Sequence, residues 1–236
     1  MPRFVFGCCL ALLALLGVAE QATTEVFRPT VDGADLPLST RRSVMSRCPM
    51  CNAGGLGGLY LLAPMQVATT TAAYPTLHWY QPTQGENRIT VSLHQYDPEQ
   101  ETLSHLFHTS FVVTGEPGIA ALPLSADLGM SPLVIGETYY WEVMFFCEPD
   151  SCRADHYAQG WVQRIEVDAA TAQQLAAASP SERVEIAANA GLWLEAVTGL
   201  ATLLRQRPED PDLQRRWAEL LASVGLEVLT EEPLLP

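Results

Sequence analysis

Seven short extended runs fill residues 56–167, and they constrain the possible folds more than any other feature of the chain. The runs are rich in β-branched and aromatic residues: "LGGLYLLAPM", "PTLHWYQP", "RITVSLHQY", "LFHTSFVVT", "GIAALPL", "ETYYWEVMFFC" and "GWVQRIEV". Turn clusters such as "PTQGEN", "DPEQE" and "GEPG" separate them, and no helical pattern lies between them. Short strands with frequent turns are typical of an antiparallel β-sandwich, which we expect over residues 56–168.

The run at residues 88–96 indicates how such a strand would face the core. Apolar and polar side chains alternate there, which predicts one buried face and one wet face. The buried face would hold Ile89, Val91 and Leu93, and the wet face Thr90, Ser92 and His94. Half-buried strands of this kind favour a sandwich of the immunoglobulin or fibronectin-III type.

A tyrosine corner is predicted in "LVIGETYYWEV", residues 133–143. In such a corner a tyrosine hydroxyl bonds back to the preceding backbone as the chain enters a late sandwich strand, and the spacing singles out Tyr139. The alternative is an ordinary aromatic strand. One strand face would carry Tyr139, Trp141, Val143, Phe145 and Cys147.

The periodicity becomes helical after residue 167, and cap residues mark where helices begin. Asp168 can cap the run "AATAQQLAAA". Ser179 and Glu182 then form a capping box around Pro180. We expect residues 169–236 to form a small helical bundle that packs as a cap on the sandwich.

Two apolar helical stripes contain Trp193 and Trp217. Ala196 and Pro208 lie where a tetratricopeptide repeat would place its small residue and its closing proline, although no second repeat follows. Because such repeats bind peptides in an open groove, we hypothesise that residues 180–226 present a partner-binding surface that includes both tryptophans. The alternative is that the stripes pack a core.

The N-terminus has the pattern of a secretory signal peptide. Arg3 precedes the apolar run "FVFGCCLALLALLGVA", which is short for a membrane span and ends in small residues. We expect cleavage after Ala19, which removes residues 1–19 and leaves a periplasmic or secreted protein. Residues 20–55, which contain "CPMC", would form a flexible lead. No run in the mature chain is long and apolar enough to cross a membrane.

Charge and composition exclude several classes of function. The formal net charge is -14, which disfavours nucleic acid as a partner because phosphates are negative. All thirteen basic residues are arginine, so no lysine can form a Schiff base or complete a P-loop. The chain has no metalloprotease, EF-hand, nucleophile-elbow or dinucleotide-binding motif, and we expect no cofactor.

The histidines form no ligand pattern in the sequence. They are His78, His94, His105, His108 and His156. His105 and His108 would face opposite ways on a regular strand, so we expect neither a metal site nor a catalytic residue among the histidines. Glu142 is the one acid inside the aromatic strand, and we expect it to face solvent or to pair with an arginine such as Arg164.

Four cysteines remain beyond residue 19: Cys48, Cys51, Cys147 and Cys152. An even number behind an export signal favours disulfides. Four thiolates could instead close a tetrahedral zinc site, although the second pair lacks the spacing of a zinc knuckle. A redox pair is the third interpretation, but "NAGGLGG" will not form the helix that activates a thiol.

Several ordered blocks resemble the domain of unknown function 928 family, exported proteins common in cyanobacteria. The blocks are "YPTLHWYQP", "GIAALPL", "GETYYWEV", "GWVQRIE", "AGLWLEAVTGLATLLRQRPED" and "WAELLASVGL", and the resemblance covers about residues 47–233. The family has a cysteine after an arginine- and glycine-rich lead and another at the end of the "YYW" strand. These match Cys48 (or Cys51) and Cys147, and the resemblance implies no activity.

The even cysteine count, the export signal and the inward-facing position expected for Cys147 at a strand end lead to a disulfide prediction. We expect a Cys48–Cys147 bond, with Cys51–Cys152 as the second bond. The local pairs Cys48–Cys51 and Cys147–Cys152 are the alternative, and they would close far smaller loops.

The function that these patterns favour is a non-enzymatic extracytoplasmic module that binds another envelope or secreted protein. No nucleophile, base and orienting group stand out together, which counts against an enzyme. The alternatives are a periplasmic hydrolase with an unidentified site and a zinc-stabilised structural domain.

Overall fold

A computed structural model of the chain describes Phe27, Leu36 and residues 42–43, 56–82 and 85–236. The expected signal peptide lies outside these described residues, as do Cys48 and Cys51.

Among the described residues, the smaller of two sheets has four strands in the order β1-β2-β4-β7, each antiparallel to its neighbours. These strands are β1 (Arg42–Ser43), β2 (Leu59–Leu61), β4 (Thr76–Gln81) and β7 (Gly118–Pro123). Pairing of β1 with β2 places one part of the expected flexible lead in a sheet. Phe27, from the same lead, is buried. The expectation of a flexible lead is therefore wrong at these two places.

In the part of the chain that the structure describes, the larger sheet has five strands in the order β3-β9-β8-β5-β6. They are β3 (Val67–Thr70), β5 (Gly85–Asp97), β6 (Thr102–Gly115), β8 (Thr138–Phe146) and β9 (His156–Arg164). The β3–β9 pair is parallel, with Val67 beside Trp161 and Thr70 beside Arg164. The prediction of an entirely antiparallel sandwich is wrong at this pair, because the short threonine-rich β3 lies between the predicted runs.

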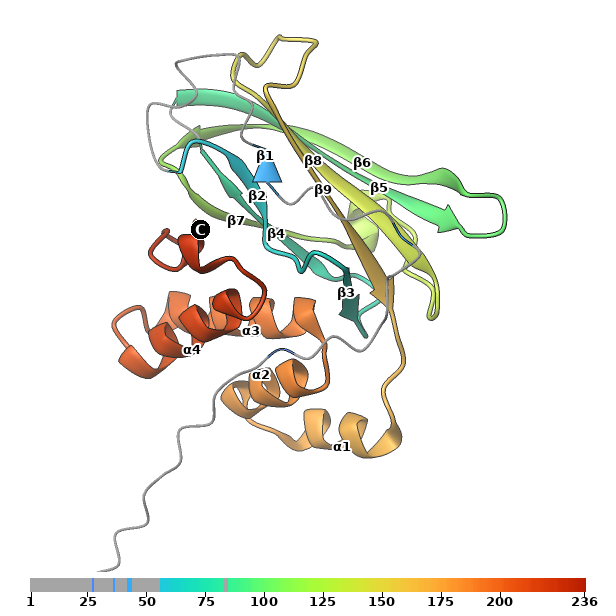
Figure 1. The fold of residues 1–236 in the computed structure, drawn as a ribbon, viewed down its shortest axis with the longest axis vertical. Coiled ribbons are helices and arrows are strands. Elements are labelled where there is room, and N and C mark those ends of the chain that lie inside the picture. Colours follow the sequence, from blue (N-terminus) through green and yellow to red (C-terminus); the bar gives the residue numbers. More distant parts are fainter. Residues whose placement is uncertain (1–26, 28–35, 37–41, 44–55, 83–84) are drawn as a thin grey trace, which may run out of the picture.

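The two sheets pack face to face, and their inner faces form much of the core (Figure 1). The rings of Trp79 on β4 and Phe111 on β6 have centroids 6.3 Å apart. On β9, Gly160 leaves room for Leu61 of β2, whose Cδ1 would lie 3.3 Å from an added Cβ. The chain is therefore a mixed α/β fold with two facing sheets, and the finer immunoglobulin-type prediction is not confirmed.

Four α-helices of the described residues form a layer beside the sheets (Figure 1). They are α1 (Ala169–Ala177), α2 (Pro180–Asn189), α3 (Trp193–Gln206) and α4 (Pro211–Ala222), and the short 3-10 turns are η2 (Ala126–Leu128) and η3 (Glu227–Leu229). The layer contacts the sheets through α3, which packs on β3 and β4. Helices α2 and α4 pack on α3, and α1 packs on α2. The predicted helix starts are confirmed. Asp168 accepts hydrogen bonds from the N–H groups of Ala170 and Thr171, and Ser179 forms a capping box with Glu182.

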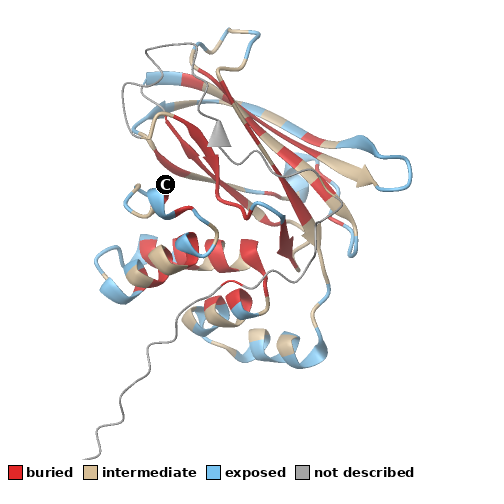
Figure 2. Ribbon diagram, viewed as in Figure 1, coloured by how far each residue is buried: buried red, intermediate tan, exposed pale blue. Residues whose placement is uncertain are grey.

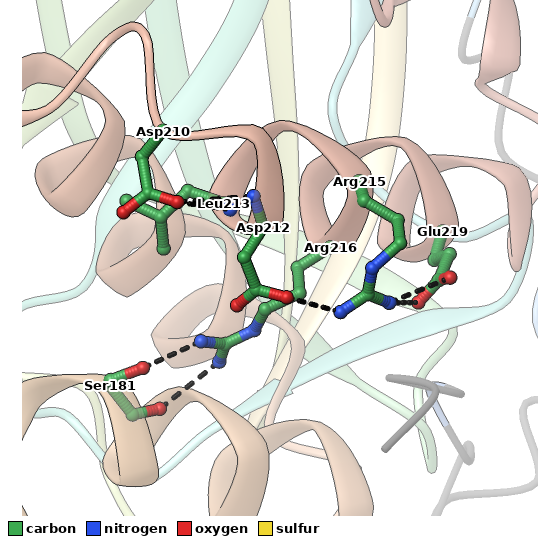
Figure 3. A network of polar contacts seen from close by, with 7 residues as sticks. All are labelled: Ser181, Asp210, Asp212, Leu213, Arg215, Arg216 and Glu219. Atoms are coloured by element: carbon green, nitrogen blue, oxygen red, sulfur yellow. Dashed lines mark hydrogen bonds and ion pairs between the residues drawn. The ribbon is translucent and has the colours of Figure 1, made fainter. Parts of the chain in front are cut away.

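Arginines on α4 tie the helical layer together (Figure 3). The buried Arg216 reaches α2, where its Nη1 donates to Ser181 Oγ over 2.6 Å and its Nη2 to the Ser181 carbonyl over 3.1 Å. Arg215 remains on its own helix and pairs with Asp212 and Glu219, over 2.5 and 2.8 Å. Exposed pairs such as these contribute little stability, so the buried Arg216 contact is the one that orients α4 on α2.

Trp193 anchors the helical layer on the smaller sheet. Its indole Nε1 donates to the Leu62 carbonyl over 2.8 Å, and its ring meets Phe27 edge-on with centroids 4.9 Å apart. Trp193 is 0% exposed and Trp217 is 3% exposed. The hypothesis that both tryptophans form a partner-binding surface is therefore wrong, because both apolar stripes face the core (Figure 2).

One hydrophobic cluster runs through both sheets and the helices. The expected division between residues 56–168 and 169–236 therefore does not separate two cores. No described helix is both long enough and apolar enough to cross a membrane.

Candidate functional site

A β-bulge in β6 changes which side chains share a face of the larger sheet. Leu93 pairs with Phe107, but His94 pairs with His105, so Leu106 is the extra residue on β6. The bulge reverses the alternation between His105 and His108, and both side chains lie on the same side. The expectation that they face opposite ways is therefore wrong.

We call the side of the larger sheet that points away from the smaller sheet the outer face. Cross-strand register assigns to it Glu86, Arg88, Thr90, Ser92, His94 and Tyr96 of β5, Leu103, His105, His108, Ser110, Val112 and Thr114 of β6, Thr138, Tyr140, Glu142, Met144 and Phe146 of β8, and Tyr157, Gln159, Trp161 and Gln163 of β9. The inner positions between them, such as Val91 and Val143, are buried in the core. On this face Thr90 and Ser92 are also buried, so the predicted wet face of β5 is wrong at these two small residues.

Three histidines form a row across β5 and β6. The ring centroids of His94 and His105 lie 5.6 Å apart, and those of His105 and His108 lie 6.5 Å apart. His108 Nδ1 lies 3.2 Å from Ser92 Oγ, within hydrogen-bond distance. The bulge therefore gathers histidines that are eleven and fourteen residues apart from His94 in sequence.

Beside this row, two tyrosines share a polar network with Glu142 and Gln159. Tyr140 Oη lies 3.2 Å from Glu142 Oε2 and 2.7 Å from the Gln159 side-chain amide, and it also contacts the hydroxyl of Tyr157. Tyr157 contacts the same amide. The two hydroxyls, the Gln159 side-chain amide and the Glu142 carboxylate therefore form one connected hydrogen-bond network.

Burial perturbs the titration of this cluster. It raises the pKa of Tyr140 far above the ordinary value, and the hydrogen bond with Tyr157 adds to this shift. Burial also raises the pKa of Tyr157. Burial lowers the pKa of His94, an effect that Glu142 opposes and that the neighbouring His105 and His108 reinforce. Tyr140, Tyr157 and His94 are therefore uncharged at neutral pH, and the cluster offers neutral hydrogen-bonding groups.

Aromatic rings continue across the outer face. Centroid distances are 5.3 Å for Tyr96–Trp161 and for Trp161–Tyr140, and 6.0 Å for Tyr140–His94. Of the described outer-face residues, Glu86, Arg88 and Glu142 carry a formal charge. Leu103 and Val112, at the edge strand, are 46% and 53% exposed. The outer face is thus aromatic and nearly uncharged on a chain of net charge -14.

Three further polar residues that the sequence singles out are Tyr139, Glu142 and Arg164. The Tyr139 hydroxyl accepts a hydrogen bond from the Val134 N–H over 2.8 Å, which is the backward bond that defines a tyrosine corner. Glu142 contacts Tyr140, whereas Arg164 donates to the carbonyls of Thr71 and Leu133. Of the two alternatives expected for Glu142, the pair with Arg164 is therefore wrong, and the side chain lies partly exposed on the outer face.

The other two histidines are buried away from the outer face. His78 on β4 is 1% exposed, and burial lowers its pKa to about 4. His156 on β9 is also buried, with its ring 5.8 Å from that of Phe145. Among the described residues, no group of three or more His, Cys, Asp or Glu side chains could hold a metal ion.

The two described cysteines have different states. Cys147 is disulfide-bonded and Cys152 is free and exposed, so the partner of Cys147 lies outside the described residues. The local Cys147–Cys152 pair and the second predicted bond, Cys51–Cys152, are both wrong in this structure. A zinc site of four thiolates is also wrong, because Cys147 is not a thiolate. The Cys48–Cys147 pairing stays a prediction.

A cleft of about 610 Å³ opens between the β3–β4 connection and helices α2 and α3. Glu195 lies in its wall, where its Oε1 accepts hydrogen bonds from Thr70 Oγ1, Thr71 N and Thr71 Oγ1 over 2.7–2.9 Å. Its Oε2 is shielded from solvent and has no hydrogen-bond partner among the described groups. This carboxylate therefore holds α3 against the end of β3, and neither of its oxygens is free to accept a hydrogen bond from a ligand in the cleft.

Sequence reasoning missed Tyr157 and Gln159. The predicted run began at Gly160, whereas β9 begins at His156. The alternation of Tyr157, Gln159 and Trp161 with small residues was the signal that could have extended the strand. The bulge at Leu106 had no comparable signal, because no glycine or proline marks it.

Comparison with known proteins gives a family without an assigned function. No curated protein matches this sequence. The family described as Domain of Unknown Function (DUF928) matches residues 40–234, which is most of the chain. The chain therefore belongs to the Domain of Unknown Function (DUF928) family.

Proposed function

We propose that this protein is a non-enzymatic interaction module that uses the outer face to bind another envelope or secreted protein. The single observation that carries the proposal is the aromatic, nearly uncharged character of that face on a strongly acidic chain. Depletion of charge and enrichment in aromatic residues mark the centres of protein interfaces. Tyrosine is also enriched among residues that dominate binding energy.

The hydrogen-bonding groups of the outer face suit a protein partner. Tyr140, Tyr157 and His94 are uncharged at neutral pH, so their desolvation costs less than that of ionised groups. The exposed Leu103 and Val112 lie beside them on the edge strand and add apolar area. A partner can therefore cover the face without leaving many charges unpaired.

One observation favours the hydrolase alternative, namely the contact between Ser92 Oγ and His108 Nδ1. A serine nucleophile needs access to substrate and a base that a third group orients. Ser92 is 4% exposed, and Glu142, the acid nearest to the histidine row on the outer face, contacts Tyr140. The described residues therefore support binding better than hydrolysis.

Export is part of the proposal. It rests on Arg3 and the apolar run that ends near Ala19, together with the disulfide at Cys147. Mass spectrometry of the protein purified from the native host should find Glu20 at or near the N-terminus. An intact Met1 form confined to the cytoplasm would refute export.

The interaction test introduces a negative charge at exposed positions. His105→Glu and Val112→Glu each place a carboxylate on the outer face, where it would be buried by a bound partner. Gln173→Glu, on exposed α1, is the matched control. In cross-linking followed by mass spectrometry on the native envelope, we expect a partner captured by the unaltered and control proteins to be lost with both outer-face variants. Equal capture by all four proteins would refute the proposed surface.

A further inference from the structure

The C-terminal segment, residues 230–236, lies along the edge of the smaller sheet. Among the described strands β7 is the last of this sheet, and the segment fills its free side (Figure 1). The Ile119 N–H donates to the Pro233 carbonyl over 2.7 Å, and the Leu235 N–H donates to the Ile119 carbonyl over 2.8 Å. Leu234 and Ile119 form a parallel bridge. The segment thus behaves as one further, very short strand.

The edge of β7 is shaped for this close approach. A Cβ at Gly118 would lie 2.7 Å from both the Pro233 carbonyl oxygen and Leu235 Cδ2, so glycine is needed beside the segment. Arg205 of α3 closes the far end, where its Nε and Nη2 donate to the Leu235 carbonyl over 3.1 and 2.8 Å. Two elements distant in sequence therefore converge on the backbone of the same three residues.

The pairing sets a sequence rule for the occupant. Position 233 needs only a carbonyl acceptor, so proline fits there although it has no N–H. Position 235 must donate an N–H, so proline cannot stand there. The side chains of Leu234 and Leu235 are half-buried, which favours apolar residues at both positions. The rule is therefore two successive apolar residues, of which the second is not proline, and the residue before them can be proline.

The segment itself is weakly held. None of residues 231–236 is fully buried. A cleft of about 930 Å³ separates the segment from α3 and α4, with Pro208, Pro211 and Trp217 among its lining residues. Segments that bury little apolar surface open at low free energy, so this one is suited to leave its place without unfolding the core.

We propose that the β7 edge is a strand-acceptor site that binds an extended segment of a partner protein with two successive apolar residues, the second of which is not proline. The chain's own C-terminal segment occupies this site and acts as a built-in competitor. Addition of a strand to a free sheet edge is a recurrent mode of peptide recognition, in which backbone bonds give affinity and side chains give selectivity. The site lies on the smaller sheet, so it is distinct from the outer face, and either proposal can fail without the other.

The test uses the chain's own segment as the probe, a fluorescent peptide of sequence TEEPLLP. In the full chain, Leu235→Pro removes the N–H that donates a hydrogen bond to the Ile119 carbonyl, and it should release the segment. Fluorescence anisotropy should then show at least tenfold tighter binding of the peptide to the Leu235→Pro protein than to the unaltered protein. Adding Gly118→Ala to Leu235→Pro should abolish the binding, since the new Cβ meets the peptide backbone.

If circular dichroism shows that a variant is unfolded, a second peptide still allows the proposal to be tested on the unaltered protein. TEEPLPP lacks the N–H at the position of Leu235, and the unaltered protein should bind it at least tenfold more weakly than TEEPLLP. Equal affinity for the two peptides, no detectable binding of either at millimolar concentration, or binding unaffected by Gly118→Ala would overturn the proposal. A concentration-dependent dimer that Gly118→Ala abolishes would overturn the choice of partner and assign the site to a second copy.

Discussion

The indole Nε1 of Trp193 donates a hydrogen bond to the backbone carbonyl of Leu62 over 2.8 Å, and this bond joins residues 131 positions apart at the contact between helix and sheet. A buried carbonyl that loses its donor retains the cost of its desolvation. The Trp193 side chain therefore stabilises the fold through its ring and through its N–H, and substitution can separate the two.

Trp193→Phe keeps an aromatic ring against Phe27 but removes the N–H. We expect a loss of about 1–3 kcal/mol in the free energy of unfolding, measured by urea denaturation. Trp193→Ala also leaves a cavity and should cost about 3–5 kcal/mol. The control, Val228→Ala, changes an exposed side chain and should leave stability nearly unaltered. A Trp193→Phe protein as stable as the unaltered one would show that the indole bond is dispensable.

His78 should make stability depend on pH. Its pKa falls from 6.5 to about 4 on folding because the side chain is buried, so between these pH values the unfolded chain binds a proton that the folded chain does not. Stability therefore rises with pH in this window and is lost as pH falls from 6.5 to 4, by about 3 kcal/mol in total. His78→Leu should flatten the curve by about 1.4 kcal/mol per pH unit within the window. Parallel curves for the two proteins would contradict this origin.

Tyr139→Phe removes the hydroxyl that accepts the Val134 N–H. Loss of this bond should cost about 0.5–1.5 kcal/mol, because the exposed loop can expose the N–H to water. The matched control is Tyr96→Phe, whose hydroxyl has no hydrogen bond to another described group. Equal stability of Tyr139→Phe and Tyr96→Phe in chemical denaturation would argue against a stabilising corner.

Thiol chemistry should distinguish Cys152 from Cys147. Without reductant, iodoacetamide should label the exposed Cys152 and leave Cys147 unmodified. Non-reducing peptide mapping should then find the Cys147 peptide joined to the "CPMC" peptide, with Cys48 as the expected partner. In the chain-entropy model a loop of about 100 residues stabilises by roughly 4–5 kcal/mol. Quantitative labelling of Cys147 without reductant would refute the bond.

Local chemistry explains what the sequence predicted well. The caps at Asp168 and Ser179 depend on side chains that bond to backbone groups two or three residues away, so a short window contains the whole interaction. The bond between Tyr139 and Val134 spans five residues and was accessible in the same way. The strand runs were visible because alternation of apolar side chains is also local.

Non-local pairing explains what the sequence did not predict. The helical stripes of Trp193 and Trp217 showed that these residues share an apolar face, but the face could have pointed to a partner or to the core. The outcome depends on Leu62 and Phe27, which are far away in sequence. The outer-face cluster likewise depends on a bulge at Leu106 that only the pairing of β5 with β6 creates.

The parallel pairing of β3 with β9 determines when this chain can complete its fold during synthesis. Val67 has no partner in the sheet until Trp161 has been synthesised. Thr70 likewise lacks its hydrogen-bond acceptor until Glu195, 125 residues later, has been synthesised. Because β3 is held from both sides by segments made much later, the first half of the chain cannot close as an independent unit. Contacts of such long sequence separation also slow folding. A ribosome that pauses before residue 195 would therefore hold an incomplete sheet edge, and rapid completion of the last third of the chain protects that edge from mispairing.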